Sequence, residues 1–203
     1  MAQSIPEMYG SLVFNDKVMR SKLPKDMYKA LKKTIENGTH LELDVANSVA
    51  VAMKEWATEN GATHYTHWFQ PMTNVTAEKH DSFISPTGDG QVIMDFSGKE
   101  LVKGEPDASS FPSGGLRATL KQEDIQHGIL LHLHSLKMKT LYIPTAFCSY
   151  SGEALDKKTP LLRSMDVLNK EAVRILHLLG NKEVRHIDTT VGPEQEYFLV
   201  DKS

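Results

Sequence analysis

The segment from residue 43 to residue 59 carries the pattern that most restricts the fold, an apolar stripe with helical spacing. The stripe recurs three or four positions apart and comprises Val45, Val49, Ala52, Met53 and Trp56. This period matches the 3.6-residue turn, so one face of a helix is apolar. Asn60-Gly61 follows and is suited to end that helix. We favour a core-facing helix over a surface that docks a partner.

A helix is also predicted just before this segment. Pro24 suits a first helical turn, and Asn37-Gly38 is typical of a carboxyl-terminal cap. The pattern of residues 1–23 predicts an irregular lead-in.

The pattern changes after residue 61, where residues 62–70 are rich in Thr, Tyr, Trp and Phe and are followed by Pro71. Such a composition predicts a strand. Further strands are predicted at 81–85, 91–96, 98–102 and 140–147, then a helix at 160–180 and two strands within 183–201. The fold class is therefore α+β, divided into residues 1–61 (helical), 62–150 (mostly sheet) and 151–203.

Composition excludes several classes of protein. The 23 basic and 26 acidic residues give a net charge of -3, so the chain has no basic footprint for nucleic acid. It has no apolar run long enough to cross a membrane and no signal-peptide pattern at its start. The single cysteine, Cys148, cannot form an internal disulfide and fits a reducing, cytoplasmic location. A buried thiol is favoured over a nucleophile for this residue.

Two acidic residues, Glu194 and Glu196, lie close to the end of the sequence before an apolar run. On a strand they share a face, with Cα atoms about 7 Å apart, whereas Gln195 points to the other side. Paired carboxylates repel unless a cation lies between them, and their hard oxygens favour Mg²⁺ or Mn²⁺. A solvated strand face without metal is the alternative from the spacing alone.

Several motifs resemble one enzyme family. The stretch 192–199, GPEQEYFL, is similar to the G-x-E-x-E-[FY]-[FY] strand that opens the catalytic domain of glutamine synthetases. Three other stretches resemble the type III branch of that family: KHDSF at 79–83, PSGGLRAT at 112–119 and SGEALDKKTPLLRSM at 151–165. The resemblance covers nearly the whole chain, and it implies a β-grasp-like sheet at 62–150 and the first helix and strands of a catalytic domain at 151–203.

The resemblance implies a glutamate–ammonia ligase that uses ATP. The γ-carboxylate of glutamate is phosphorylated, and ammonia then displaces phosphate, with divalent ions neutralising the phosphoryl oxygens. By position in the motif, Glu194 would hold the nucleotide-side ion and Glu196 the ion nearer the amino acid.

The loop Asp107-Ala108-Ser109-Ser110 resembles the family's Asp-Gly-Ser-Ser loop, which reaches into the neighbouring subunit's active site. The resemblance implies a ring-shaped homo-oligomer and gives Asp107 a role in binding ammonium and taking its proton. Ala108 departs from the glycine of other branches. The alternative for Asp107 is an Asx-type turn without a catalytic role.

The family's other metal ligands and its nucleotide-binding residues lie beyond Ser203, so the resemblance also implies an inactive fragment of a longer protein. Two other functions remain open at this point. One is a β-grasp assembly module without chemistry, which has no need of Glu194 and Glu196. The other is a related γ-glutamyl-amine ligase, against which the type III motifs argue.

Residues 120–137, LKQEDIQHGILLHLHSLK, depart from the family pattern. A nucleotide string that encodes the family-like peptide FEARGYTAWDPTSPAFIK encodes the present residues when it is read from its second base. We therefore interpret this segment as the product of two compensating frame shifts. His127, His132 and His134 within it form a cluster that mimics a zinc site, but out-of-frame residues have no selected role there.

We predict that residues 120–137 are the worst-packed part of the chain, because their sequence was not selected for this fold. Native-state amide hydrogen exchange should show weak protection across them. Strong protection throughout the segment would instead mean that it is an integral part of the fold.

Overall fold

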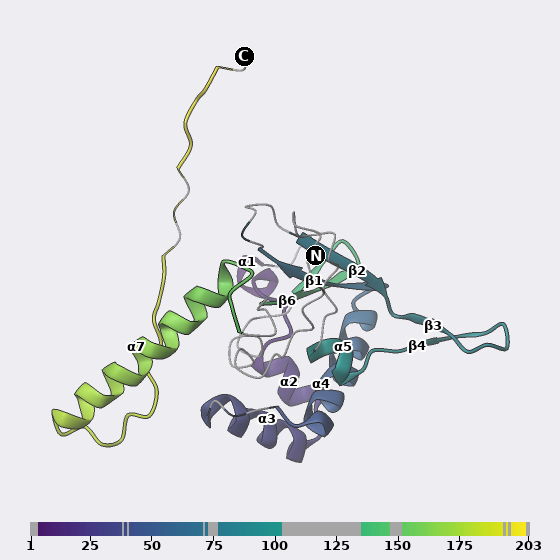
Figure 1. Ribbon diagram of the computed structural model, residues 1–203. Coiled ribbons are helices and arrows are strands. Elements are labelled where there is room, and N and C mark those ends of the chain that lie inside the picture. The colour runs from purple at the N-terminus through teal and green to yellow at the C-terminus, as the bar shows by residue number, and fades with distance from the viewer. Residues whose placement is uncertain are drawn as a thin grey trace. The chain divides into compact units, whose positions relative to one another are not determined.

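The computed structural model describes residues 4–37, 39, 41–70, 72, 77–102, 135–146, 152–192, 194 and 196–201 (Figure 1). Its helices and strands confirm the predicted α+β class, whereas the β-grasp description stays a prediction. The chain separates into two compact units, Met1–Leu162 and Arg163–Ser203. The domain limits expected from the sequence also stay a prediction.

The first residues form two helices, α1 (Ile5–Met8) and α2 (Asp16–Lys22), so the predicted irregular lead-in is wrong. Local capping explains both. The Asn15 side chain accepts a hydrogen bond of 3.1 Å from the Val18 amide at the start of α2. The Glu7 carboxylate accepts one of 2.9 Å from the Ser4 amide at the start of α1.

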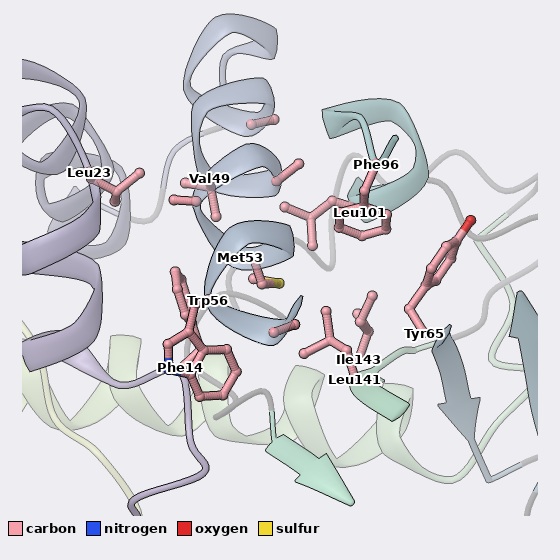
Figure 2. Close-up of a cluster of buried hydrophobic side chains, with 14 of the residues drawn as sticks. Phe14, Leu23, Val49, Met53, Trp56, Tyr65, Phe96, Leu101, Leu141 and Ile143 are labelled. Atoms are coloured by element: carbon pink, nitrogen blue, oxygen red, sulfur yellow. The ribbon is translucent and has the colours of Figure 1, made fainter. Parts of the chain in front are cut away.

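Helix α4 (Leu43–Glu59) lies at the centre of the core, and the whole predicted stripe is buried in it. In Figure 2, Leu23 and Phe14 lie on one side of α4, and Met53 points to the other side, toward Leu141 and Ile143. The rings of Phe14 and Trp56 are 5.4 Å apart. Helix α3 (Lys25–Asn37), which was predicted, contributes Leu31 to the same core.

Helix α5 (Gly98–Val102) lies against α4, so the strand predicted at 98–102 is wrong. Gly98 allows this approach, since an added Cβ would lie 2.6 Å from the Asn47 amide nitrogen and 2.7 Å from the Ala46 carbonyl carbon. The Gly98 amide donates a 2.9 Å hydrogen bond to the Asn47 side chain. Burial against α4 thus decides the conformation of a segment whose local pattern favours a strand.

The main sheet has the strand order β2-β1-β6-β5. Strand β1 (His64–Phe69) pairs antiparallel with β2 (Ala77–Ser82) and parallel with β6 (Thr140–Pro144), and β6 pairs antiparallel with β5 (Ser135–Lys137). The prediction of strands at 62–70 and 140–147 is confirmed. Tyr65 points from β1 into an aromatic cluster, with its ring 5.2 Å from that of Phe83 and 4.7 Å from that of Phe96.

A separate two-stranded ribbon is formed by β3 (Ile84–Pro86) and β4 (Val92–Met94). Strand β3 overlaps the end of the segment predicted at 81–85, whose start belongs to β2, and β4 lies within the segment predicted at 91–96. Helix α7 (Lys158–Leu178) follows and confirms the helix predicted at 160–180. The described residues of 183–201 contain no strand, so they do not show the two strands predicted there.

The two-residue turn between β5 and β6 has an unusual backbone. Met138 and Lys139 have φ angles of 47° and 63°, the left-handed region that both positions of a type I′ hairpin turn require. Asn-Gly is the favoured pair there, because other side chains crowd the backbone at positive φ.

We predict that Lys139→Gly raises the free energy of unfolding by about 1 kcal/mol, because glycine removes the steric cost of the left-handed conformation. Urea unfolding followed by circular dichroism measures this change. The control is Lys137→Gly in the neighbouring strand, which should lower stability. Equal effects of the two substitutions would contradict the strain at the turn.

Candidate metal-binding segment

Glu194 and Glu196 follow helix α7 and the segment that returns from its end. The helix ends in a Schellman motif, in which the Gly180 amide bonds the His177 carbonyl and the Asn181 amide bonds the Leu176 carbonyl. Gly180 adopts a φ of 97°, which glycine permits. The cap therefore reverses the chain at a defined point.

Beyond the cap, the chain runs back along α7. The His177 ring bonds the Val184 carbonyl at 2.8 Å, and the Asn169 side chain accepts a 2.8 Å hydrogen bond from the Ile187 amide. Each contact lies nearer the start of the helix than the one before, so the returning segment is antiparallel to α7.

The two glutamates are exposed and lie outside any assigned strand. The apolar residues that follow are also exposed, with Tyr197 and Phe198 both 82% and Leu199 105% accessible. Adjacent residues point to opposite faces of an extended chain, so both faces of this stretch are apolar. Such a stretch is typical of a strand that is covered on both faces.

The donor chemistry of this segment suits a hard cation, but the number of donors is small. Glu194 and Glu196 supply carboxylate oxygens of the kind that Mg²⁺ and Mn²⁺ prefer. In the part of the chain that the structure describes, no group of three or more His, Cys, Asp or Glu side chains could hold a metal. Two carboxylates supply only part of an octahedral shell, so Glu194 and Glu196 by themselves make at most a portion of a metal site.

Five other residues singled out from the sequence lie outside the described residues. Asp107 is one, so its proximity to the two glutamates stays untested. The others are Cys148 and the three histidines of the segment 120–137: His127, His132 and His134.

A polar junction that was not predicted from the sequence lies where the start of α7 meets the end of β1. The Asp156 carboxylate accepts a 2.7 Å hydrogen bond from the Thr159 amide and so caps the helix. The Lys157 amide bonds the Gln70 carbonyl at 2.9 Å. The sequence does carry a signal for this cap, because an aspartate three positions before a residue in the first turn of a helix is a common N-terminal capping pattern.

Lys158 completes this junction. Its ammonium lies 4.2 Å from the centre of the Trp68 ring and has no hydrogen-bond partner among the described residues. Burial lowers the pKa of Lys158, and the nearby charge of Asp156 opposes this shift. The aromatic face therefore provides much of the stabilisation of this cation, and the contact fixes the first turn of α7 against β1.

His67 is the most buried histidine of the sheet, at 4% exposure. Its Nε2 donates to the Glu100 carbonyl at 2.8 Å, and its Nδ1 pairs with the Thr145 hydroxyl at 3.0 Å. Both ring nitrogens are engaged, so His67 is a structural residue that joins β1 to α5.

An open hollow of about 560 Å³ lies between the first residues and β5. Its lining is mainly apolar or uncharged and comprises Met8, Gly10, Ser11, Leu12, Val13, Asn60, Ser135 and Leu136. None of these side chains titrates near neutral pH, so the lining supplies no general acid or base. Nor does any helix in the described part of the chain combine the length and hydropathy of a bilayer-spanning segment.

Comparison with known proteins identifies relatives along the whole chain. The chain is 45% identical over 206 residues to a type-3 glutamine synthetase of Dictyostelium discoideum, an alignment that covers 99% of this chain and 28% of the relative. It is 46% identical over 202 residues to a glutamine synthetase of Bacteroides fragilis, with 100% of this chain and 28% of the relative covered. A glutamine synthetase of Butyrivibrio fibrisolvens is 45% identical, with 99% and 29% covered.

The chain thus spans less than a third of the length of these relatives. A family model described as "Glutamine synthetase type III N terminal" matches residues 5–164. That match covers most of the chain and includes the core helix α4, the main sheet and the junction at the start of α7. The chain therefore belongs to the type III glutamine synthetase family.

Proposed function

We propose that this chain forms the amino-terminal part of a glutamate–ammonia ligase, an enzyme that makes glutamine from glutamate, ammonia and ATP. The observation that supports it most is the sequence identity of about 45%, along the full chain, to relatives named glutamine synthetase. The same names favour ammonia as the nitrogen donor over a larger amine.

The proposed reaction has two steps. A carboxylate is a poor electrophile, so the γ-carboxylate of glutamate first attacks the γ-phosphorus of ATP and ADP leaves. Ammonia then attacks the acyl carbon of γ-glutamyl phosphate, and phosphate leaves with the bonding electrons. The ammonium ion must lose a proton before it attacks, and a nearby carboxylate can accept that proton.

Glu194 and Glu196 are the proposed metal ligands of this chain. A divalent cation, Mg²⁺ or Mn²⁺, supplies charge neutralisation at the transferring phosphoryl group when it is bound. By position in the family motif, Glu194 serves the nucleotide side and Glu196 the amino acid side. The remaining ligands would come from sequence that corresponds to the longer part of the relatives.

The exposed apolar stretch after the glutamates supports this assignment. A strand needs a neighbour for its backbone hydrogen bonds, and a strand that is apolar on both faces needs cover on both. We infer that residues 192–201 become a strand when the rest of the catalytic domain pairs with them. Strand geometry would then place Glu194 and Glu196 on one face and Gln195 on the other.

Asp107 is the proposed group that binds ammonium and takes its proton. By the resemblance, its loop would lie at the active site of a neighbouring subunit, an arrangement that requires a homo-oligomer. Ammonium is a compact cation, so a carboxylate is a suitable counter-charge and base for it.

The metal ligands can be tested in a chimera in which this chain, with FEARGYTAWDPTSPAFIK at 120–137, replaces the aligned residues of the Bacteroides fragilis relative. Glu196→Ala should lower the rate of glutamine formation by at least about 100-fold, because a missing ligand leaves the phosphoryl charge less neutralised. Gln195→Ala is the matched control and should cost less than about tenfold. Initial rates are measured against Mg²⁺ concentration. If the two variants behave alike, the assignment of ligands by strand face fails.

Asp107→Ala in the same chimera tests the second assignment. It should raise the ammonium concentration needed for half-maximal rate by at least about tenfold, because the counter-charge of ammonium is lost. The KM for ATP should stay nearly unchanged. Ser109→Ala in the same loop is the control. A change in ATP affinity without a change in ammonium dependence would place Asp107 elsewhere in the mechanism.

A further inference from the structure

The second compact unit, Arg163–Ser203, consists of most of helix α7 and the segment after it. None of its described residues is buried. A domain of about 40 residues usually needs disulfides, metals or a partner, because it buries too little apolar surface to be stable alone. The described residues of this unit therefore lack a core of their own.

Helix α7 has one polar strip along its length. Residues four apart lie on the same side of a helix, so Asp166, Lys170 and Arg174 share this strip. The Lys170 ammonium lies 2.7 Å from the Asp166 carboxylate within it. The other sides of the helix are mainly apolar, which differs from the single apolar face of a helix on the surface of a protein.

One apolar side of α7 is covered by the segment that returns from the end of the helix. The Asn169 side chain and the His177 ring bond this segment at Ile187 and Val184, each at 2.8 Å. The apolar residues on this side are partly buried: Met165, Ala172, Val173 and Leu176. This side is thus already used within the second unit.

A second apolar side of α7 is open to solvent. Its members lie within about 120° of the helix circumference. They are 51–77% exposed and comprise Val167, Leu168, Ile175, Leu178 and, directly after the helix, Leu179. We call these five residues the open side. Glu171 lies among them, but its carboxylate is paired with Arg174 at 2.7 Å. A helix with two apolar sides is typical of one that is covered on both.

Two observations indicate which part of the protein covers the open side. The family model for the N-terminal region ends at residue 164, next to the start of the second unit at Arg163. Most of α7 therefore belongs with sequence that follows the N-terminal region. The alignments cover 28% of two relatives, so more than two thirds of each relative lies outside the aligned region.

We propose that the open side of α7 binds the part of the same polypeptide that follows the position of Ser203 in the relatives. That part would begin directly after the exposed apolar stretch 197–200, which lies in the same unit as α7. A partner that is tethered so closely acts at an effective concentration of about 1 mM, which favours it over a free molecule. Its contact surface must be apolar, because unpaired charges are costly to bury.

The proposal rests on membership of the family and goes beyond the proposed reaction. It concerns a contact rather than a chemical step, so the accessibility of side chains tests it. A chimera that folds but forms no glutamine would refute the proposed function and would still give a valid result here.

The test compares the isolated 203-residue chain with the Bacteroides fragilis chimera, through the rate at which an introduced cysteine reacts with a maleimide. Leu168→Cys on the open side should react at least about 30-fold more slowly in the chimera, because a covered thiol is inaccessible to the reagent. Lys170→Cys on the polar strip is the matched control and should change less than about threefold. All variants also carry Cys148→Ser, and mass spectrometry of the peptide with the new cysteine measures its labelling alone.

Ile175→Cys repeats the test two turns along the helix, and circular dichroism verifies that each variant folds. Equal labelling of Leu168→Cys and of Ile175→Cys in the isolated chain and in the folded chimera overturns the proposal. In the isolated chain these rates should stay constant from about 10 µM to about 500 µM. Rates that fall as the concentration rises would assign the open side to a second copy and would overturn the proposal as well.

Discussion

The burial of helix α4 is the constraint on which the first unit depends. Its apolar residues contact α2 and α3 on one side and α5 and the sheet on the other, so removing any one large side chain affects several elements at once. Burial of a side chain such as Met53 contributes about 1.5–3 kcal/mol. Gly98 adds a steric condition, since a Cβ at this position would lie only 2.6–2.7 Å from backbone atoms of α4 and glycine avoids that overlap.

The sequence predicted correctly those helices and strands whose conformation is determined by residues within the element itself. The limits of α4 were predicted at 43–59, because its stripe and the following Asn60-Gly61 act within one helix. The start of α2 was missed, although Asn15 caps it, because a seven-residue helix shows too little periodicity. The segment 98–102 was assigned wrongly, since its contact with Asn47, far away in the sequence, decides its conformation.

The candidate metal ligands show that contacts between distant parts of a sequence also limit the prediction of a functional site. Glu194 and Glu196 were singled out from their spacing and from the family motif, but in the proposed site their arrangement depends on strands that would pair with residues 192–201. The described part of this chain brings no third ligand to them. A site that is assembled from distant strands can be recognised from the sequence of one strand, but its geometry cannot be worked out from that strand.

The proposed function assigns this chain to a glutamine-forming enzyme. The chimera with the Bacteroides fragilis relative gives the sharpest test of that proposal, through the glutamine formed from glutamate, ammonium and ATP. We expect a rate within about 100-fold of the relative's own, dependent on all three substrates, because the ligands and loops of the two parts would complete one active site. A chimera that folds and assembles like the relative but forms no glutamine would rule the proposal out.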